Sequence, residues 1–209
     1  MTIQSWLSTI RQSRVIGVIR TPRWDWGLPM AKAAIAGGVQ LIEITWNSDR
    51  PGEVIQQLRQ ECPHAVIGAG TLLTVAQVEA AIAAGAQFLF TPHVNPILIQ
   101  TAIAQDIPLV AGALTPTEIV TAWQAGATCV KVFPVQAVGG AEYVRCLQGP
   151  LGEIPLIPTG GVTLANTMEF LQAGAIAVGL SGDLFPRQAI QTERWDVITQ
   201  RAATLFAKL

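Results

Sequence analysis

One phrase recurs through this chain of 209 residues: an alanine-rich segment closes with Ala-Gly and leads directly into a run of apolar residues. It occurs as AGGVQLIEI, AAGAQFLF, QAGATCVKV and QAGAIAVGL. Glycine suits the end of a helix because it adopts a positive φ without a clash of Cβ. Each phrase therefore predicts a helix that ends and a strand that begins.

The apolar runs are short and mostly continuous, which is typical of parallel strands covered on both faces. Eight strands are expected, over Val15–Arg20, Val39–Thr45, Ala65–Ala69, Phe88–Thr91, Leu109–Ala111, Thr128–Val132, Leu156–Pro158 and Ala177–Leu180. Helices are expected between them, for example over Asp25–Ala36, Pro51–Gln60, Val75–Ala83 and Leu164–Gln172, and a short amphipathic helix is expected at the N-terminus.

Eight strands that each lead into a helix predict an α/β fold, a (β/α)₈ TIM barrel with an N-terminal helix. The barrel is expected to form one domain over residues 1–209, because no linker or low-complexity segment interrupts the pattern. A doubly wound open sheet is the alternative, but no Gly-x-Gly-x-x-Gly fingerprint or P-loop follows any expected strand.

Composition excludes several classes of protein. A hydrophobic content of 50% and a net charge of −1 exclude a disordered chain and give no basic surface for nucleic acid or anionic membrane. No apolar run is long enough to span a membrane, and the N-terminus lacks the pattern of a signal peptide. The three cysteines form no Cys-x-x-Cys pair, which predicts reduced thiols and a cytoplasmic protein.

Lys131 is the one lysine that falls inside an expected strand. If Val130 and Val132 face the helices, the two-residue alternation turns Lys131 into the barrel mouth, where catalytic groups of such barrels lie. Burial favours the neutral amine, which is the nucleophile that a Schiff base requires. The alternative is a lysine that pairs with a carboxylate or extends past the end of the strand.

Glu43 lies between two isoleucines in the strand that reads Leu-Ile-Glu-Ile-Thr. Near Lys131, its carboxylate could transfer protons as a general acid and base. The alternative is a plain ion pair with Lys131 or Arg20. No cluster of His, Cys, Asp and Glu has the spacing of metal ligands, so the sequence favours a mechanism without a metal or cofactor.

Two glycine-containing loops predict a phosphate site. Gly160 and Gly161 follow the seventh expected strand, and Ser181 follows the eighth. Barrels often bind phosphate with the loops after these two strands, where backbone N–H groups can approach an anion closely.

The chain resembles the family of 2-keto-3-deoxy-6-phosphogluconate (KDPG) aldolase, which includes 4-hydroxy-2-oxoglutarate (KHG) aldolase. The phrases AGGVQLIEIT, VIGAGTLLT, FLFTPHVNP, VKVFPVQAVGG and IPTGGVTLAN carry the resemblance, in the family's order and spacing. They cover about Val15 to Ala177, and the match continues more loosely to the end of the chain. The resemblance implies a barrel, a carbon–carbon lyase of the class I aldolase type, and a homotrimer.

Residue by residue, the resemblance implies a Schiff-base lysine at Lys131 and a proton-transfer glutamate at Glu43. It implies that Thr71 and Pro92 line the pyruvate pocket and that Phe133 forms an aromatic wall. Gly160, Gly161 and Ser181 fall on the family's phosphate-binding positions.

The chain departs from the family pattern at a few positions. Some members have an arginine four residues after the glutamate; here that position is Asn47, and Arg20 resembles a replacement that binds substrate anions. Leu180 stands where a glycine commonly precedes the serine, and Asp183 follows closely. We expect the Asp183 carboxylate to point away from the site, because it would otherwise repel a dianion.

The expected reaction is cleavage of 2-dehydro-3-deoxy-6-phosphogluconate to pyruvate and D-glyceraldehyde 3-phosphate, with 4-hydroxy-2-oxoglutarate as a further substrate. The phosphogalactonate epimer remains an alternative substrate. More distant alternatives are a phosphate-binding isomerase or synthase on the same barrel, and a non-catalytic barrel that binds sugar-acid phosphates.

Overall fold

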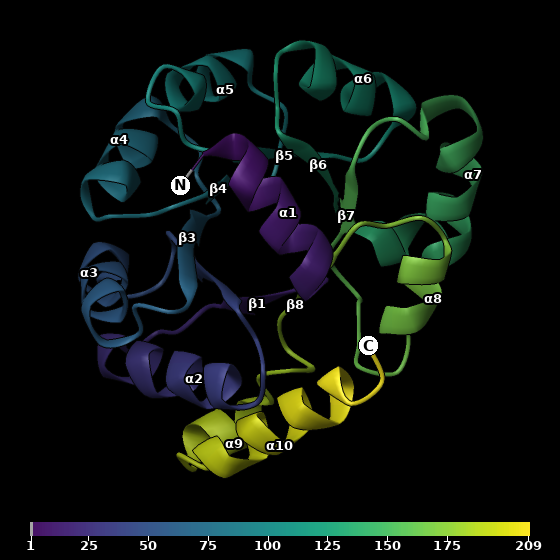
Figure 1. Cartoon of the computed structure of the whole chain (residues 1–209). Coiled ribbons are helices and arrows are strands. Elements are labelled where there is room, and N and C mark those ends of the chain that lie inside the picture. Colours follow the sequence, from purple (N-terminus) through teal and green to yellow (C-terminus); the bar gives the residue numbers. More distant parts are fainter. Residues whose placement is uncertain (1) are drawn as a thin grey trace.

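The computed structural model describes residues 2–209 and shows a parallel barrel ringed by helices (Figure 1). The strands run in the order β7-β6-β5-β4-β3-β2-β1-β8, and every neighbouring pair is parallel. A parallel bridge between Thr159 and Gly179 joins the two ends of the sheet. This arrangement confirms the predicted (β/α)₈ fold and excludes the open doubly wound sheet.

All eight expected strands form, and their ends differ from the prediction by a few residues at most. They are β1 (Val15–Ile19), β2 (Leu41–Thr45), β3 (Val66–Gly70), β4 (Leu89–Phe90), β5 (Leu109–Ala113), β6 (Cys129–Val132), β7 (Leu156–Pro158) and β8 (Val178–Leu180).

One helix, α1 (Ile3–Ser13), precedes the first strand, and the other helical segments follow the strands and form the outer layer. They are α2 (Trp24–Ala36), α3 (Pro51–Glu61), α4 (Val75–Ala83), α5 (Pro96–Ile103), α6 (Pro116–Gln124), the 3₁₀ turn η1 (Val135–Val138), α7 (Ala141–Leu151), α8 (Thr167–Gln172), α9 (Arg187–Gln191) and α10 (Trp195–Phe206).

The predicted start of one helix was wrong. The sequence pattern places a helix from Leu164, but α8 begins at Thr167. The side chain of Asn166 accepts a hydrogen bond from the Thr163 N–H, at 2.7 Å, and donates one to the Gly161 carbonyl, at 3.2 Å. Because this side chain binds the loop backbone, residues 164–166 form a turn in place of a first helical turn.

The core has an inner and an outer part, as two-residue alternation along the strands requires. Inside the barrel, side chains such as Ile16, Leu41 and Val110 pack with Trp6 and Ile10 of α1. In Figure 1, α1 lies across the near end of the barrel. The helix therefore closes the end at which the strands begin and leaves the other end, where the strands finish, for the loops that carry polar side chains.

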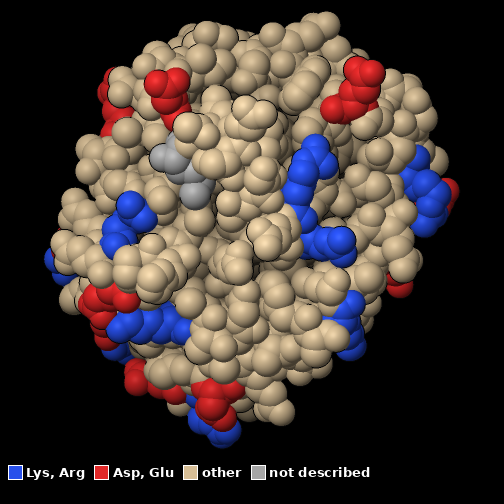
Figure 2. Space-filling model, viewed as in Figure 1, with Lys and Arg blue, Asp and Glu red and all other residues tan. Residues whose placement is uncertain are grey.

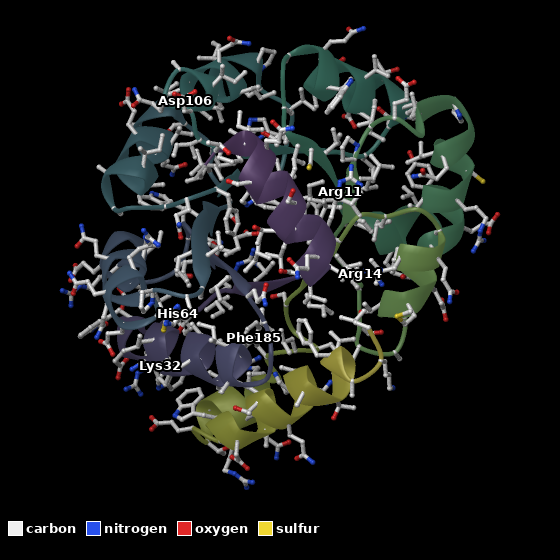
Figure 3. All side chains as sticks on the ribbon, viewed as in Figure 1. Arg11, Arg14, Lys32, His64, Asp106 and Phe185 are labelled. Atoms are coloured by element: carbon white, nitrogen blue, oxygen red, sulfur yellow. The ribbon has the colours of Figure 1, made fainter. Side chains whose placement is uncertain are left out.

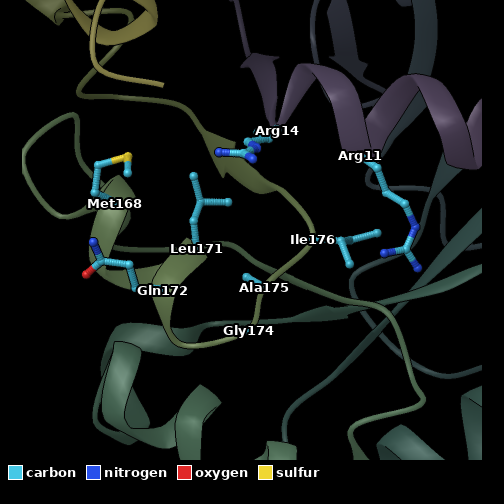
Figure 4. Close-up of a pocket in the computed structure, with 8 residues that line it drawn as sticks. All are labelled: Arg11, Arg14, Met168, Leu171, Gln172, Gly174, Ala175 and Ile176. Atoms are coloured by element: carbon cyan, nitrogen blue, oxygen red, sulfur yellow. The ribbon is translucent and has the colours of Figure 1, made fainter.

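The face covered by α1 is the one at which the strands begin. Charged side chains are scattered over it (Figure 2). Arg11 belongs to α1, and Arg14 is the residue that follows this helix (Figure 3). These two arginines line a cavity of about 390 Å³ beside α8 (Figure 4). This cavity lies at the amino ends of the strands, whereas barrel active sites form at the carboxyl ends.

Within residues 2–209, no helix combines the length and the apolar character that crossing a membrane requires.

Candidate active site

Lys131 is the charged residue that β6 buries. Val130 and Val132 pack in the outer core and Cys129 packs in the barrel interior, so Lys131 also points inward, as the alternation predicts. The residue is only 5% exposed, and this burial lowers the pKa of its ammonium group. Because burial costs the charged form more than the neutral one, the site favours a nucleophilic amine.

Glu43 occupies the corresponding inward position of β2 and is 1% exposed. Burial raises the pKa of its carboxyl group, and the positive charges of Lys131 and Arg20 oppose that rise. The two groups are therefore close enough for each charge to shift the pKa of the other: Lys131 lowers that of Glu43, and Glu43 raises that of Lys131.

Lys131 and Glu43 are nevertheless not a closed ion pair. Among residues 2–209, no carboxylate lies within ion-pairing distance of Lys131, and neither oxygen of Glu43 accepts a hydrogen bond. Buried polar groups in proteins are normally satisfied, and exceptions point to a function or to a bound molecule. The alternative of a plain ion pair between Glu43 and Lys131 or Arg20 is therefore not what residues 2–209 show.

Glycines on neighbouring strands make room for these side chains. A Cβ at Gly70 of β3 would lie 1.7 Å from Glu43 Oε1, so the carboxylate rests directly on the strand backbone. A Cβ at Gly112 of β5, the residue paired with Lys131, would lie 2.3 Å from the Pro92 carbonyl carbon. Any larger residue at either position would displace a predicted site residue.

Phe133 and Gly160 lie next to the lysine. The Phe133 ring centroid is 4.7 Å from Lys131 Nζ, and a Cβ on Gly160 would lie 3.1 Å from the same ring. The structure thus brings the predicted aromatic wall and the first phosphate-loop glycine to one side of Lys131. Phe90 of β4, whose centroid is 5.8 Å from Nζ, was not predicted.

Thr71 directly follows β3, and Pro92 lies two residues after β4 at the same end of the barrel. Thr71 comes directly after Gly70 and has a φ of 59°, a left-handed conformation that is rare for a β-branched residue. Pro92 lies beside Gly112, as described above. Thr71 thus adjoins the glycine on which Glu43 rests, and Pro92 lies beside the glycine paired with Lys131; that the two residues line a pyruvate pocket stays a prediction.

Arg20 and Ser181 meet in a cavity of about 470 Å³ between the loops after β1 and β8. Arg20 Nε donates to Asn47 Oδ1 at 3.2 Å, so the asparagine that departs from the family pattern orients the arginine. Arg187 also lines this cavity, and Phe185 (Figure 3) forms part of its apolar wall. The cavity lining includes no acidic residue, so it is suited to an anionic group.

Free backbone N–H groups gather in the two predicted phosphate loops. The carbonyls of Thr159 and Gly160 accept hydrogen bonds from η1, and that of Gly161 accepts one from Asn166. A trans peptide points its N–H away from its carbonyl. The Gly160 N–H faces the Gly179 carbonyl across the bridge between the two loops, whereas the N–H groups of Gly161 and Val162 donate to no acceptor within residues 2–209. Such consecutive N–H groups form an anion-binding concavity.

The loop after β8 contributes in the same way. The N–H groups of Ser181 and Gly182 also donate to no acceptor in the described chain. The two loops adjoin because β7 and β8 are bridged through Thr159 and Gly179. The structure thus brings all of the predicted substrate-binding residues to the carboxyl ends of the strands.

Thr159 is a candidate that the sequence analysis missed. It is 7% exposed, and its hydroxyl oxygen has no hydrogen-bond partner. It follows β7 at the inward position two residues after Ile157, so counting the alternation to the end of the strand would have identified it. Within residues 2–209, no three His, Cys, Asp or Glu side chains group closely enough to hold a metal ion.

Comparison with known proteins assigns the chain to a family. The sequence profile described as KDPG and KHG aldolase matches residues 7–201. A 2-dehydro-3-deoxy-phosphogluconate aldolase of Treponema pallidum is 33% identical over 91% of this chain and 90% of its own length. The KHG/KDPG aldolase of Escherichia coli strain K12 is 32% identical over 97% of this chain and 96% of its own length.

A solved structure agrees with the sequence relatives. The KDPG aldolase of Legionella pneumophila, with pyruvate captured at low pH as a covalent carbinolamine intermediate, superposes with a TM-score of 0.88. It is 29% identical, and the match covers 95% of this chain and 97% of that one. This protein belongs to the KDPG and KHG aldolase family.

Proposed function

We propose that the chain is a class I aldolase that cleaves 2-dehydro-3-deoxy-6-phosphogluconate to pyruvate and D-glyceraldehyde 3-phosphate. The observation that carries this proposal is a buried lysine without an ion-pair partner in the described chain, close to a buried glutamate whose oxygens are free. Cleavage of 4-hydroxy-2-oxoglutarate to pyruvate and glyoxylate needs the same two groups and is proposed as a second activity.

In the proposed mechanism, the neutral amine of Lys131 attacks the C2 carbonyl and forms a carbinolamine. Loss of water then gives an iminium ion. Glu43 takes the proton of the C4 hydroxyl, the C3–C4 bond breaks, and its electron pair moves into the enamine while the aldehyde leaves. Protonation at C3 and hydrolysis then release pyruvate and restore the amine.

The proposal predicts a pyruvate adduct on Lys131. Pyruvate forms an iminium ion with the amine, and borohydride reduces that ion to a stable secondary amine. Peptide mass mapping is expected to place the adduct on Lys131 and on neither Lys32 nor Lys208. Binding of pyruvate without any adduct would reject the class I mechanism.

Arg20 is predicted to bind a substrate anion. Replacing Arg20 by alanine should raise the KM for the phosphorylated substrate about tenfold or more, because a hydrogen bond to a charged group is worth about 1.5–3 kcal/mol. The matched control is Arg23→Ala, which removes an exposed arginine that pairs with Asp25. Steady-state kinetics in which both variants had the KM of the wild type would contradict this role for Arg20.

We further propose that the aldolase barrel spans residues 1–209, acts in the cytoplasm and assembles as a homotrimer. Three free cysteines support a reducing compartment. The exposed side chains of Leu73, before α4, and Ile97, in α5, supply apolar surface for contact between subunits. Sedimentation or light scattering of the purified protein measures the subunit number.

A further inference from the structure

Asp183 connects the two loops that carry the free N–H groups. It lies in the loop after β8, two residues beyond Ser181, and its Oδ2 accepts a hydrogen bond from the Leu164 N–H at 2.7 Å. Leu164 belongs to the loop after β7, three residues beyond Gly161. One carboxylate oxygen therefore joins the segments that flank the candidate phosphate site.

Arg201 of α10 holds this carboxylate from the other side. Its Nη2 donates to Asp183 Oδ1 at 2.5 Å, and its Nε donates to the Asp183 carbonyl at 2.6 Å. The carboxylate thus points toward Leu164 and Arg201, which confirms the expectation that it faces away from the site. The guanidinium also balances the negative charge of Asp183, which would otherwise oppose a bound dianion.

The contacts define a clamp, by which we mean Asp183, Arg201 and the Leu164 N–H. Asn166 braces the loop after β7 from within, through Thr163 and Gly161, but it does not reach the loop after β8. Among residues 2–209, Asp183 is the one residue of the loop after β8 whose side chain is hydrogen-bonded both to the loop after β7 and to an outer helix.

We propose that Asp183 is a positioning residue that sets the separation of the two phosphate-binding loops and so determines the preference for phosphorylated substrates. This inference rests on the proposed function, because it assumes that the free N–H groups bind the substrate phosphate. Preorganised donors bind an anion more tightly since no ordering of the loops is required on binding. Lys131 and Glu43 lie on separate strands, so their chemistry does not depend on the clamp.

The proposal is tested with Asp183→Ala and two sugar acids that differ only in the phosphate. For the phosphorylated acid, KM should rise about tenfold, the effect of losing one charge-assisted hydrogen bond, while kcat stays within about twofold. For 2-dehydro-3-deoxygluconate, which lacks the phosphate, kcat/KM should not change. Calorimetric titration with glycerol 3-phosphate should show a Kd about tenfold higher than that of the wild type.

Two further variants separate positioning from a general loss of structure. Asp183→Asn keeps an acceptor for the Leu164 N–H and should stay within about fivefold of the wild type, because a partly exposed ion pair contributes little. Asp196→Ala removes the exposed partner of Arg194 and should leave both sugar acids unaffected. If Asp183→Ala does not fold, Asp183→Asn decides: a higher Kd for glycerol 3-phosphate with an unchanged kcat/KM for the unphosphorylated acid supports the clamp, and an unchanged Kd or an equal loss on both sugar acids rejects it.

Equal losses on the two sugar acids, or an unchanged Kd for glycerol 3-phosphate, would overturn the proposal. Failure of the clamp is distinguishable from failure of the aldolase mechanism. Absence of a reduced pyruvate adduct in the wild type would reject the mechanism, whereas the titration with glycerol 3-phosphate decides the clamp without any turnover.

Discussion

Replacing Lys131 by alanine is expected to lower kcat by on the order of 10⁴-fold or more, because a covalent mechanism loses its nucleophile. The residue is buried beside Glu43, and burial lowers the pKa of its amine. Water or another side chain cannot form the iminium ion that accepts the electron pair of the C3–C4 bond. Turnover is measured by coupling the released pyruvate to NADH-dependent lactate dehydrogenase.

Lys208→Ala is the matched control, because it removes an exposed lysine at the end of the chain. This control should keep wild-type turnover and should still form the reduced pyruvate adduct, whereas Lys131→Ala should form none. An unchanged circular dichroism spectrum would show that the loss in Lys131→Ala is chemical. Turnover near that of the wild type in Lys131→Ala would assign the reaction to a different group.

The fold was predictable because its signals are local. Each of the four Ala-Gly phrases marks a helix end followed by a strand, and the regular spacing of the eight expected strands leaves few other topologies. Lys131 and Glu43 were predictable for a related reason. A charged residue within a buried strand is costly, and the alternation of the strand decides the side of the sheet on which it lies.

Other features depend on contacts between distant segments. The close approach of Gly70 to Glu43 depends on the register between β2 and β3, which no local pattern specifies. The clamp joins residues 164, 183 and 201, which lie far apart in the sequence. The sequence analysis identified only Asp183 among them, as a carboxylate that could repel a bound dianion. The start of α8 was misplaced because Asn166 binds loop backbone that the hydrophobic pattern assigns to the helix.

The burial of Glu43 has opposite effects on stability and on catalysis. Burial raises the pKa of its carboxyl group, so the folded state favours the protonated form. Ionisation of Glu43 therefore costs stability as the pH rises from the pKa of the unfolded chain, about 4.3, through the higher pKa of the folded state. The proposed reaction nevertheless requires the ionised form, because only a carboxylate can take the C4 hydroxyl proton.

Glu43→Gln tests this conflict. The variant is expected to lose on the order of 10²–10⁴-fold in kcat, the usual contribution of a general base, while it still forms the pyruvate adduct on Lys131. The wild-type pH profile of kcat should fall on the acid side at a pH above the ordinary glutamate value of about 4.3, and this acid limb should be absent from the variant. Glu153→Gln, which changes an exposed glutamate, is the control and should keep the wild-type profile.

Thermal unfolding at pH 8 supplies the independent measurement. The neutral amide removes the cost of a buried charge, so Glu43→Gln should be at least as stable as the wild type at this pH, and the difference should shrink as the pH falls toward 4. A variant that is both inactive and clearly less stable would indicate a structural role for Glu43. An active variant with an unchanged acid limb would transfer the proton-transfer role to another group, and the Thr159 hydroxyl, which has no partner in residues 2–209, is the next to test.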